Sequence, residues 1–386
     1  MITVNLKLPP DATFLSSILY EGILYATAQY SVTYDYKTIK FNAYFLKQAF
    51  KDLHSEEYNN IRIGLAGKND NINETLFKKF SIDAASRKTL SEIFAKLNEN
   101  FSLLSVDKDV IELQQLDRKG NILIDASDEK DGLSLQLLKI DRYTGLSSLE
   151  TKYTTKQLTL YLSKEALLIA LLGIFSSYVC TVGDEIYFLS YSPEQVLELL
   201  SKSDKTLLTT YTNIKADVKR NLKEILEKIY LNELIFLELL LNLEIANKMR
   251  KSNLNKFSTI LFKIKREGPT YKIYEVIPIT VFDKIVFNEK IRDYFRDRID
   301  SFIEAVRSFL TNSSVLNSLA SLNKGKKRDE ADNILKAVQS LYKFIIVGDG
   351  WGLYNFVREL WAASEKAEKD HNSRKAYLQL IKRIPY

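Results

Sequence analysis

FSTILFKIKREGPTYKIYEVIPI, residues Phe257–Ile279, carries the strongest structural signal in this chain. Two runs rich in β-branched and aromatic residues, Phe257–Lys265 and Tyr271–Ile279, flank Arg266-Glu267-Gly268-Pro269-Thr270, and adjacent Gly and Pro are typical of a turn. The segment therefore predicts a β-hairpin. Because helix-forming sequence surrounds it, we expect an α+β fold.

Helical periodicity dominates the chain on both sides of this hairpin. The stretch from Thr212 to about Met249 contains neither Gly nor Pro, and its length fits one long helix or two helices with a break near Asn232. Apolar residues recur at helical spacing in four later segments, which are Glu289–Leu310, Glu330–Val347, Trp351–Lys366 and Ser373–Ile384. We therefore expect a mainly helical C-terminal domain over residues 211–386 that carries the hairpin at 257–279.

Strands and helices are mixed in the first 210 residues, which we expect to form an α+β N-terminal domain. A strand pattern at Ile2–Leu8 precedes helical periodicity over Thr13–Tyr30. Later the apolar period shifts toward two, and turn residues separate four short runs, which are Phe101–Val106, Val110–Leu116, Asn121–Ile124 and Ser134–Ile140. These runs predict an antiparallel meander.

One stretch requires a membrane test, because Ala166 to Val182 contains no charged residue. Ser176-Ser177-Tyr178 interrupts its apolarity, whereas a spanning helix needs about 20 apolar residues. A buried core helix followed by a hairpin around Gly183-Asp184 fits better. The single cysteine forms no internal disulfide, and the N-terminus lacks the features of a signal peptide, so we expect a cytoplasmic protein that makes no membrane contact.

Residues suited to catalysis are scarce. The two histidines, His54 and His371, lie in no metal-binding spacing such as HExxH, and we expect both at the surface. We expect Cys180 to be a small buried hydrophobe. The acidic run from Asp125 to Asp131 departs from the EF-hand pattern. With no recognisable base, nucleophile or ligand set, the sequence predicts a protein that is not an enzyme and uses no cofactor or metal.

Gly348-Asp349-Gly350-Trp351-Gly352 is the motif closest to a phosphate-binding turn. It follows the apolar run Phe344–Val347, which fits a strand, and it precedes an amphipathic helix whose N-terminus could meet an anion. The spacing is GxGxG rather than GxGxxG, and no Walker lysine follows. A glycine-rich corner between elements is therefore favoured, and a nucleotide- or metal-dependent enzyme is the alternative.

Positive charge is concentrated near the hairpin. The net charge is +6, and Asn247–Lys272 holds eight basic residues against one acid, Glu267. A basic hairpin suits a phosphate backbone, and Tyr271 and Tyr274 could add stacking. Lys263 and Lys265 should share one strand face because the strand period is two. The predicted nucleic-acid contacts are Lys248, Arg250, Lys251, Lys256, Lys263, Lys265, Arg266 and Lys272.

A second basic cluster lies in a predicted helix–helix loop. It adds Lys324, Lys326, Lys327 and Arg328 to the predicted nucleic-acid contacts. For both clusters a solvated, lysine-rich surface is the alternative.

The two tryptophans, Trp351 and Trp361, lie near the C-terminus with Tyr354 and Phe356 between them. Trp and Tyr are enriched at interface hot spots, so this region could dock a partner. A plain helical core is the favoured interpretation. A protein–protein scaffold is therefore a further alternative for the function.

A family resemblance rests on the order of several segments. Leu6-Lys7-Leu8-Pro9-Pro10 runs into the helical segment Phe14–Ile23, a mixed α/β body follows, and the helical C-terminal part carries the basic hairpin and Lys326-Lys327-Arg328. In length and order the chain resembles the large-subunit family of archaeal type I-A CRISPR interference (Cascade) complexes.

The resemblance implies a surveillance-complex subunit. Such a subunit helps to recognise the protospacer-adjacent motif, holds target DNA during R-loop formation and supports recruitment of the nuclease. Its partners would be DNA and/or crRNA and other CRISPR effector subunits, while guide pairing reads the sequence. The basic residues named above are inferred from charge and not from a family motif.

Overall fold

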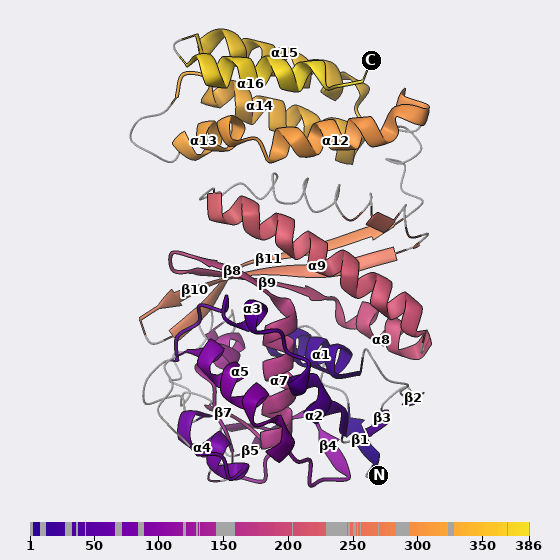
Figure 1. Ribbon diagram of the computed structural model, residues 1–386, viewed down its shortest axis with the longest axis vertical. Helices are drawn as coiled ribbons and strands as arrows, with labels where there is room; N and C mark the ends of the chain where they lie inside the picture. The colour runs from indigo at the N-terminus through magenta and orange to yellow at the C-terminus, as the bar shows by residue number, and fades with distance from the viewer. Residues whose placement is uncertain are drawn as a thin grey trace, which may run out of the picture. The chain divides into compact units, whose positions relative to one another are not determined.

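The protein was analysed as a computed structural model (Figure 1). The structure describes residues 3–7, 13–27, 33–35, 38–42, 44–65, 72–83, 89–118, 121–128, 130, 132–143, 159–202, 204–228, 245, 248–249, 252, 254, 256–268, 270–282, 294–322, 328–368 and 370–385. The chain divides into two compact units, residues 1–212 with 258–278, and residues 213–257 with 279–386. Helices and a four-stranded antiparallel sheet with smaller sheets confirm the α+β class.

Three sheets organise the described part of the first unit. Their strand orders are β2–β3–β1–β4, β5–β6–β7 and β11–β10–β9–β8. The strands are β1 (Thr3–Lys7), β2 (Thr33–Asp35), β3 (Thr38–Asn42), β4 (Val110–Glu112), β5 (Gln115–Arg118), β6 (Asn121–Ile124), β7 (Thr159–Leu162), β8 (Tyr178–Val182), β9 (Glu185–Tyr191), β10 (Lys256–Glu267) and β11 (Thr270–Phe282). The last two form the predicted hairpin, which is thereby confirmed.

The predicted antiparallel meander is wrong. β5 and β6 pair antiparallel, but β4 pairs in parallel with β1, and β6 pairs in parallel with β7. The first and last predicted strands instead contain 3₁₀ turns, η2 (Phe101–Leu103) and η3 (Gln136–Tyr143). Leu135 and Leu138 are both buried, and their three-residue spacing matches the repeat of a 3₁₀ turn.

Two apolar helices cross in the core of the first unit, α1 (Phe14–Thr27) and α7 (Lys164–Ser177). A Cβ added at Gly22 would lie 1.9 Å from the carbonyl oxygen of Ile169, and one added at Gly173 would lie 1.8 Å from that of Ile18. The two backbones therefore touch at a reciprocal pair of glycines. α7 is the predicted core helix, and no described helix is long and apolar enough to cross a membrane.

The described part of the first unit contains further helices. They are α2 (Tyr44–Lys51), α3 (Ser55–Tyr58), α4 (Ile72–Lys79), α5 (Leu90–Glu99) and α8 (Pro193–Lys202), while α9 (Lys205–Lys228) contains the boundary between the units.

The hairpin lies with the first unit and not, as predicted, with the helical C-terminal part. β10 pairs antiparallel with β9, from Thr259 opposite Tyr191 to Lys265 opposite Glu185. This pairing joins residues 68 to 80 positions apart, which local periodicity does not encode.

The described residues from 294 to 385, in the second unit, form a helical bundle. It contains α12 (Ile299–Leu310), α13 (Ser313–Ser321), α14 (Ala331–Tyr342), α15 (Gly350–Lys366) and α16 (His371–Lys382), with the short turns η4 (Arg296–Arg298) and η5 (Lys343–Val347). Phe302, Leu341 and Leu360 are fully buried in its core. The predicted helices at 330–347, 351–366 and 373–384 thus correspond to α14 with η5, α15 and α16.

The Gly348–Gly352 motif is a corner between α14 and α15, as favoured from the sequence. Gly348 ends the preceding turn with φ 76°, a left-handed conformation that suits glycine. Asp349 caps α15 by accepting a 3.0 Å hydrogen bond from the backbone N–H of Trp351. Phe344–Val347 belongs to a π-helical turn, so the suggestion of a strand there is wrong.

Candidate nucleic-acid interface

The turn of the β10–β11 hairpin places three of the predicted cations together. Lys265 is half-buried, whereas Arg266 and Lys272 are exposed. Gly268, with φ 60°, lets the chain reverse in this turn. The Arg266 backbone N–H donates a 3.1 Å hydrogen bond to the carbonyl of Asp184, in the neighbouring β8–β9 turn.

Tyr274 and Glu267 organise the charges of this hairpin tip, which we define as Lys265, Arg266, Glu267, Lys272 and Tyr274. The Lys265 ammonium lies 5.5 Å from the centroid of the Tyr274 ring. Glu267 forms a 2.5 Å ion pair with Lys272 and accepts a hydrogen bond from the Tyr274 hydroxyl. The contact with Lys272 is the main reason why the pKa of Glu267 lies below its ordinary value. The tip therefore carries three cations and one anion beside an exposed aromatic ring.

Lys263 does not belong to this exposed group, although it lies on the same strand as Lys265. Its side chain is 6 % exposed, and its ammonium lies 3.3 Å from Glu185 and 3.8 Å from Glu275. Tyr187 donates a 2.9 Å hydrogen bond to the second oxygen of Glu185. Burial, reinforced by Glu185, raises the pKa of Tyr187. Lys263 is thus a buried ion-pair partner, and its predicted contact with a phosphate is not supported by this geometry.

Other predicted residues near the hairpin differ in placement. Lys248 forms a 2.5 Å ion pair with Asp217 of α9, and Lys256 is half-buried at the start of β10. Arg250 and Lys251 lie outside the described residues. Tyr271, expected to stack on a base, is buried and donates a 3.0 Å hydrogen bond to the carbonyl of Gly64.

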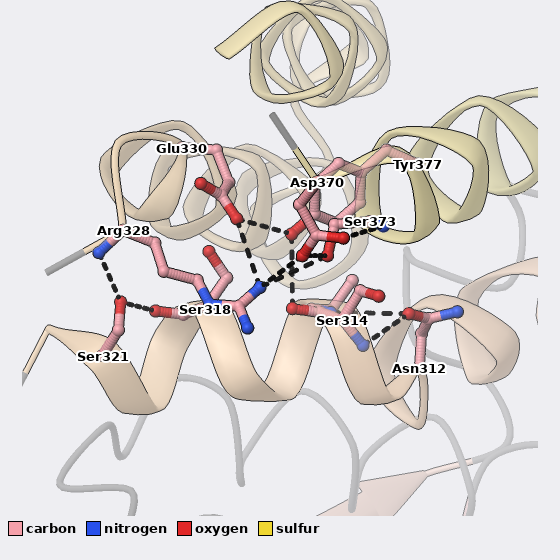
Figure 2. Close-up of polar contacts among 10 residues, drawn as sticks. Asn312, Ser314, Ser318, Ser321, Arg328, Glu330, Asp370, Ser373 and Tyr377 are labelled. Atoms are coloured by element: carbon pink, nitrogen blue, oxygen red, sulfur yellow. Dashed lines mark hydrogen bonds and ion pairs between the residues drawn. The ribbon is translucent and has the colours of Figure 1, made fainter. Parts of the chain in front are cut away.

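The second basic cluster is described only at its last residue. Lys324, Lys326 and Lys327 lie outside the described residues. Arg328 points into a polar cluster between α13 and α16 (Figure 2). Its guanidinium lies 3.6 Å from the Glu330 carboxylate and 3.4 Å from that of Asp370.

Serine side chains complete the cluster around Arg328. Its guanidinium donates a 3.2 Å hydrogen bond to Ser373 Oγ, and its backbone N–H donates one of 3.0 Å to Ser321 Oγ. Hydrogen bonds from Ser373 are the main reason why the pKa of Asp370 lies below its ordinary value. Arg328 thus holds the segment that follows the basic loop against the bundle, which is a structural role.

Replacing Arg328 with Ala should lower stability rather than remove a nucleic-acid contact. Glu330 is buried and would lose its cation, and leaving such a group unsatisfied costs about 1–3 kcal/mol. Because Arg328 is about a third exposed, we expect about 1–2 kcal/mol, measured by urea unfolding. Unchanged stability would contradict this role. The free energy of unfolding of the Arg328→Lys variant, which keeps the charge but not the forked geometry, should lie between those of the unaltered protein and Arg328→Ala.

The structure places the side chains that the sequence singled out as candidates for catalysis or metal binding. No group of three or more His, Cys, Asp or Glu among them could hold a metal ion. His54 and His371 are exposed, and Cys180 is buried, as expected from the sequence.

The aromatic residues of α15 are more exposed than the sequence predicted. Trp351, Tyr354 and Trp361 are 73 %, 61 % and 52 % exposed, so the favoured interpretation as a plain helical core is wrong. The buried face of this helix contains Gly352, Phe356, Leu360 and Ala363. A helical wheel centred on Phe356 and Leu360 would have placed both tryptophans on the opposite face.

Comparison with known proteins gives one full-length relative. A protein of Archaeoglobus fulgidus (strain ATCC 49558 / DSM 4304 / JCM 9628 / NBRC 100126 / VC-16), described as an uncharacterized protein, is 40 % identical over 397 residues, covering 100 % of each chain. This chain belongs to the family of that archaeal protein. No family model and no solved structure matches the chain. Because the alignment covers both units, we expect both in the Archaeoglobus fulgidus relative.

Proposed function

We propose that this protein is a non-catalytic nucleic-acid-binding subunit, the large subunit of a CRISPR type I-A surveillance complex. The observation that supports binding is the hairpin tip, where Lys265 lies over the exposed ring of Tyr274, and Arg266 and Lys272 are exposed near the same turn. Cations attract the phosphate backbone, and an exposed aromatic ring can stack on a base.

Each residue of the hairpin tip has a separate part in this proposal. Arg266 is exposed and can donate two parallel hydrogen bonds to one phosphate. The Lys272–Glu267 pair is also exposed, and such pairs contribute little, so a phosphate can replace the carboxylate as the partner of Lys272. Lys265 would contact the nucleic acid beside Tyr274, since its ammonium already lies over that ring.

The wider proposal extends the resemblance to the CRISPR large subunits. Target DNA and/or crRNA would be the nucleic acid, and other effector subunits would be the protein partners in the cytoplasm. Guide pairing would read the target sequence, while this protein contributes charge and shape to hold the DNA. Lys324, Lys326 and Lys327 stay part of this proposal as sequence-based predictions.

The experiment is a fluorescence-anisotropy titration of the full chain with double-stranded DNA, single-stranded DNA and RNA over a range of salt concentrations. Replacing Lys265, Arg266 and Lys272 together with Ala should weaken binding about 10-fold or more at low salt. The slope of log K against log salt concentration should become shallower by about 2 to 3, because each lost phosphate contact removes about one released counterion. The loss should be similar for all sequences.

A matched control separates local contacts from total charge. Replacing Lys51, Lys202 and Lys205, which are exposed elsewhere, with Ala removes the same charge and should leave the salt slope nearly unchanged. Equal losses in both triple variants would reduce the effect to net charge. Unchanged affinity in the hairpin variant would remove the hairpin tip from the interface, and no binding by the unaltered chain at low salt would contradict the proposal for the isolated protein.

A further inference from the structure

Helix α15 exposes an aromatic face that its own bundle leaves uncovered. The aromatic face, defined as Trp351, Tyr354, Arg358 and Trp361, follows helical spacing of three, four and three residues, and all four side chains are exposed. Ten residues of helix place Trp351 and Trp361 about 15 Å apart along the axis. Figure 1 shows α15 at an outer edge of the bundle that it forms with α12, α13, α14 and α16.

Two further apolar side chains extend this face at its N-terminal end. Tyr294 is 58 % exposed, and its hydroxyl would lie 2.6 Å from a Cβ placed on Gly350, so it lies beside the first turn of α15. Val347, three residues before Gly350, is also exposed. A cluster of exposed aromatic residues with an arginine has the composition of a protein-interaction hot spot.

The charge around the aromatic face favours a protein over a nucleic acid. Residues 331–368, which form α14, η5 and α15, contain four basic residues and five acidic ones. Surfaces that bind phosphate carry an excess of positive charge, and this one does not. Near-neutral charge also means that two such faces would not repel each other.

We propose that α15 packs antiparallel against α15 of a second copy of this chain, across a two-fold axis. The spacing of the aromatic face is the same when the helix is reversed. An axis beside Phe356 therefore places Trp351 opposite Trp361 of the second copy, and Tyr354 opposite Arg358. A contact of this kind is closed and self-complementary, as two-fold interfaces require.

The side chains of the reversed pair suit one another. Two indole rings can pack at each end of the contact, and the Arg358 guanidinium can stack on the tyrosine ring. Arg358 donates a 2.8 Å hydrogen bond to its neighbour Glu359, and its own side chain is 60 % exposed, which leaves the plane of the guanidinium open. The three–four–three spacing is also the spacing that lets two helices interlock with a shallow crossing angle.

The size of the contact predicts a weak dimer. A fully buried aromatic side chain contributes roughly 150–250 Å², and these residues are already partly covered. With Tyr294 and Val347 at the edge, each copy would bury about 600 Å² or less, at the low end for a specific interface. We therefore expect dissociation in the micromolar range.

The test uses the full chain. Its two tryptophans both lie on the aromatic face, so tryptophan fluorescence reports on this surface. Sedimentation equilibrium should show a monomer–dimer transition, and the tryptophan emission should move to shorter wavelength over the same range of concentration. Tyr354→Ala keeps both tryptophans and should shift the midpoint at least 10-fold toward higher concentration. Tyr44→Ala, which removes an exposed tyrosine of α2, should leave the midpoint unchanged.

Three results would overturn the inference. The first is a monomer at every concentration up to several hundred micromolar. The second is a dimer whose formation leaves the tryptophan emission unchanged, since another surface would then form it. The third is an emission change caused by single-stranded DNA and abolished by Tyr354→Ala, which would assign the aromatic face to nucleic acid. The inference is independent of the hairpin tip, so either proposal can fail alone.

Discussion

Replacing Gly173 with Ala is expected to destabilise the first unit by about 3 kcal/mol or more. The new Cβ would lie 1.8 Å from the carbonyl oxygen of Ile18, and this backbone atom of α1 has no rotamer by which to move away. Helix propensity alone predicts the opposite sign, because Ala in a helix interior is about 1 kcal/mol better than Gly. The substitution therefore tests packing against propensity at one site.

Hydrogen exchange followed by mass spectrometry is the measurement, because it reports each unit separately. Peptides from α1 and α7 should lose protection in Gly173→Ala, while those from α14 and α15 should not. Gly22→Ala should have the same effect. The double variant should lose less stability than the sum of the two single variants, because one added methyl group already separates the helices. Gly350→Ala is the matched control, because its near neighbour is the movable hydroxyl end of Tyr294. Stability unchanged by Gly173→Ala would refute the close crossing.

Lys263→Ala should also lower the free energy of unfolding of the first unit, by about 3–5 kcal/mol. The substitution leaves Glu185 buried without its cation, and Glu185 is 9 % exposed at the side chain. The expected loss appears in urea unfolding at neutral pH. It should be smaller in Lys263→Ala/Glu185→Gln, where no buried charge stays unpaired.

Lys265→Ala is the matched control, two residues along the same strand. Lys265 is half-buried and lies over Tyr274, so its removal should change stability by less than about 1 kcal/mol. The two substitutions should therefore affect different properties. Lys265→Ala should weaken nucleic-acid binding, whereas Lys263→Ala should chiefly lower the stability of the fold. A stable Lys263→Ala variant with lost binding would reverse this assignment and return Lys263 to the interface.

Local sequence was sufficient for elements whose signal lies within a few residues. The turn at Gly268 between two apolar runs predicted β10 and β11, and the uncharged stretch from Ala166 predicted α7 as a core helix. The glycine-rich corner before α15 was predicted for the same reason, because Gly348 and Asp349 act as local caps. Charge density along the chain likewise indicated the hairpin as a basic segment.

Partners distant in the chain decided the rest. Lys263 and Lys265 look alike in the sequence, but the ammonium of Lys263 forms an ion pair with Glu185, which lies 78 positions earlier, whereas that of Lys265 lies over the ring of Tyr274. β4 pairs with β1 rather than with its sequence neighbours, and the hairpin joins the first unit through β9. The burial of α15 is set by the bundle, which covers Phe356 and leaves Trp351 in solvent. Composition and periodicity established the α+β class and most of the helices because those signals depend on neighbouring residues, whereas strand partners, ion pairs and exposed faces depend on contacts that form only when distant segments meet.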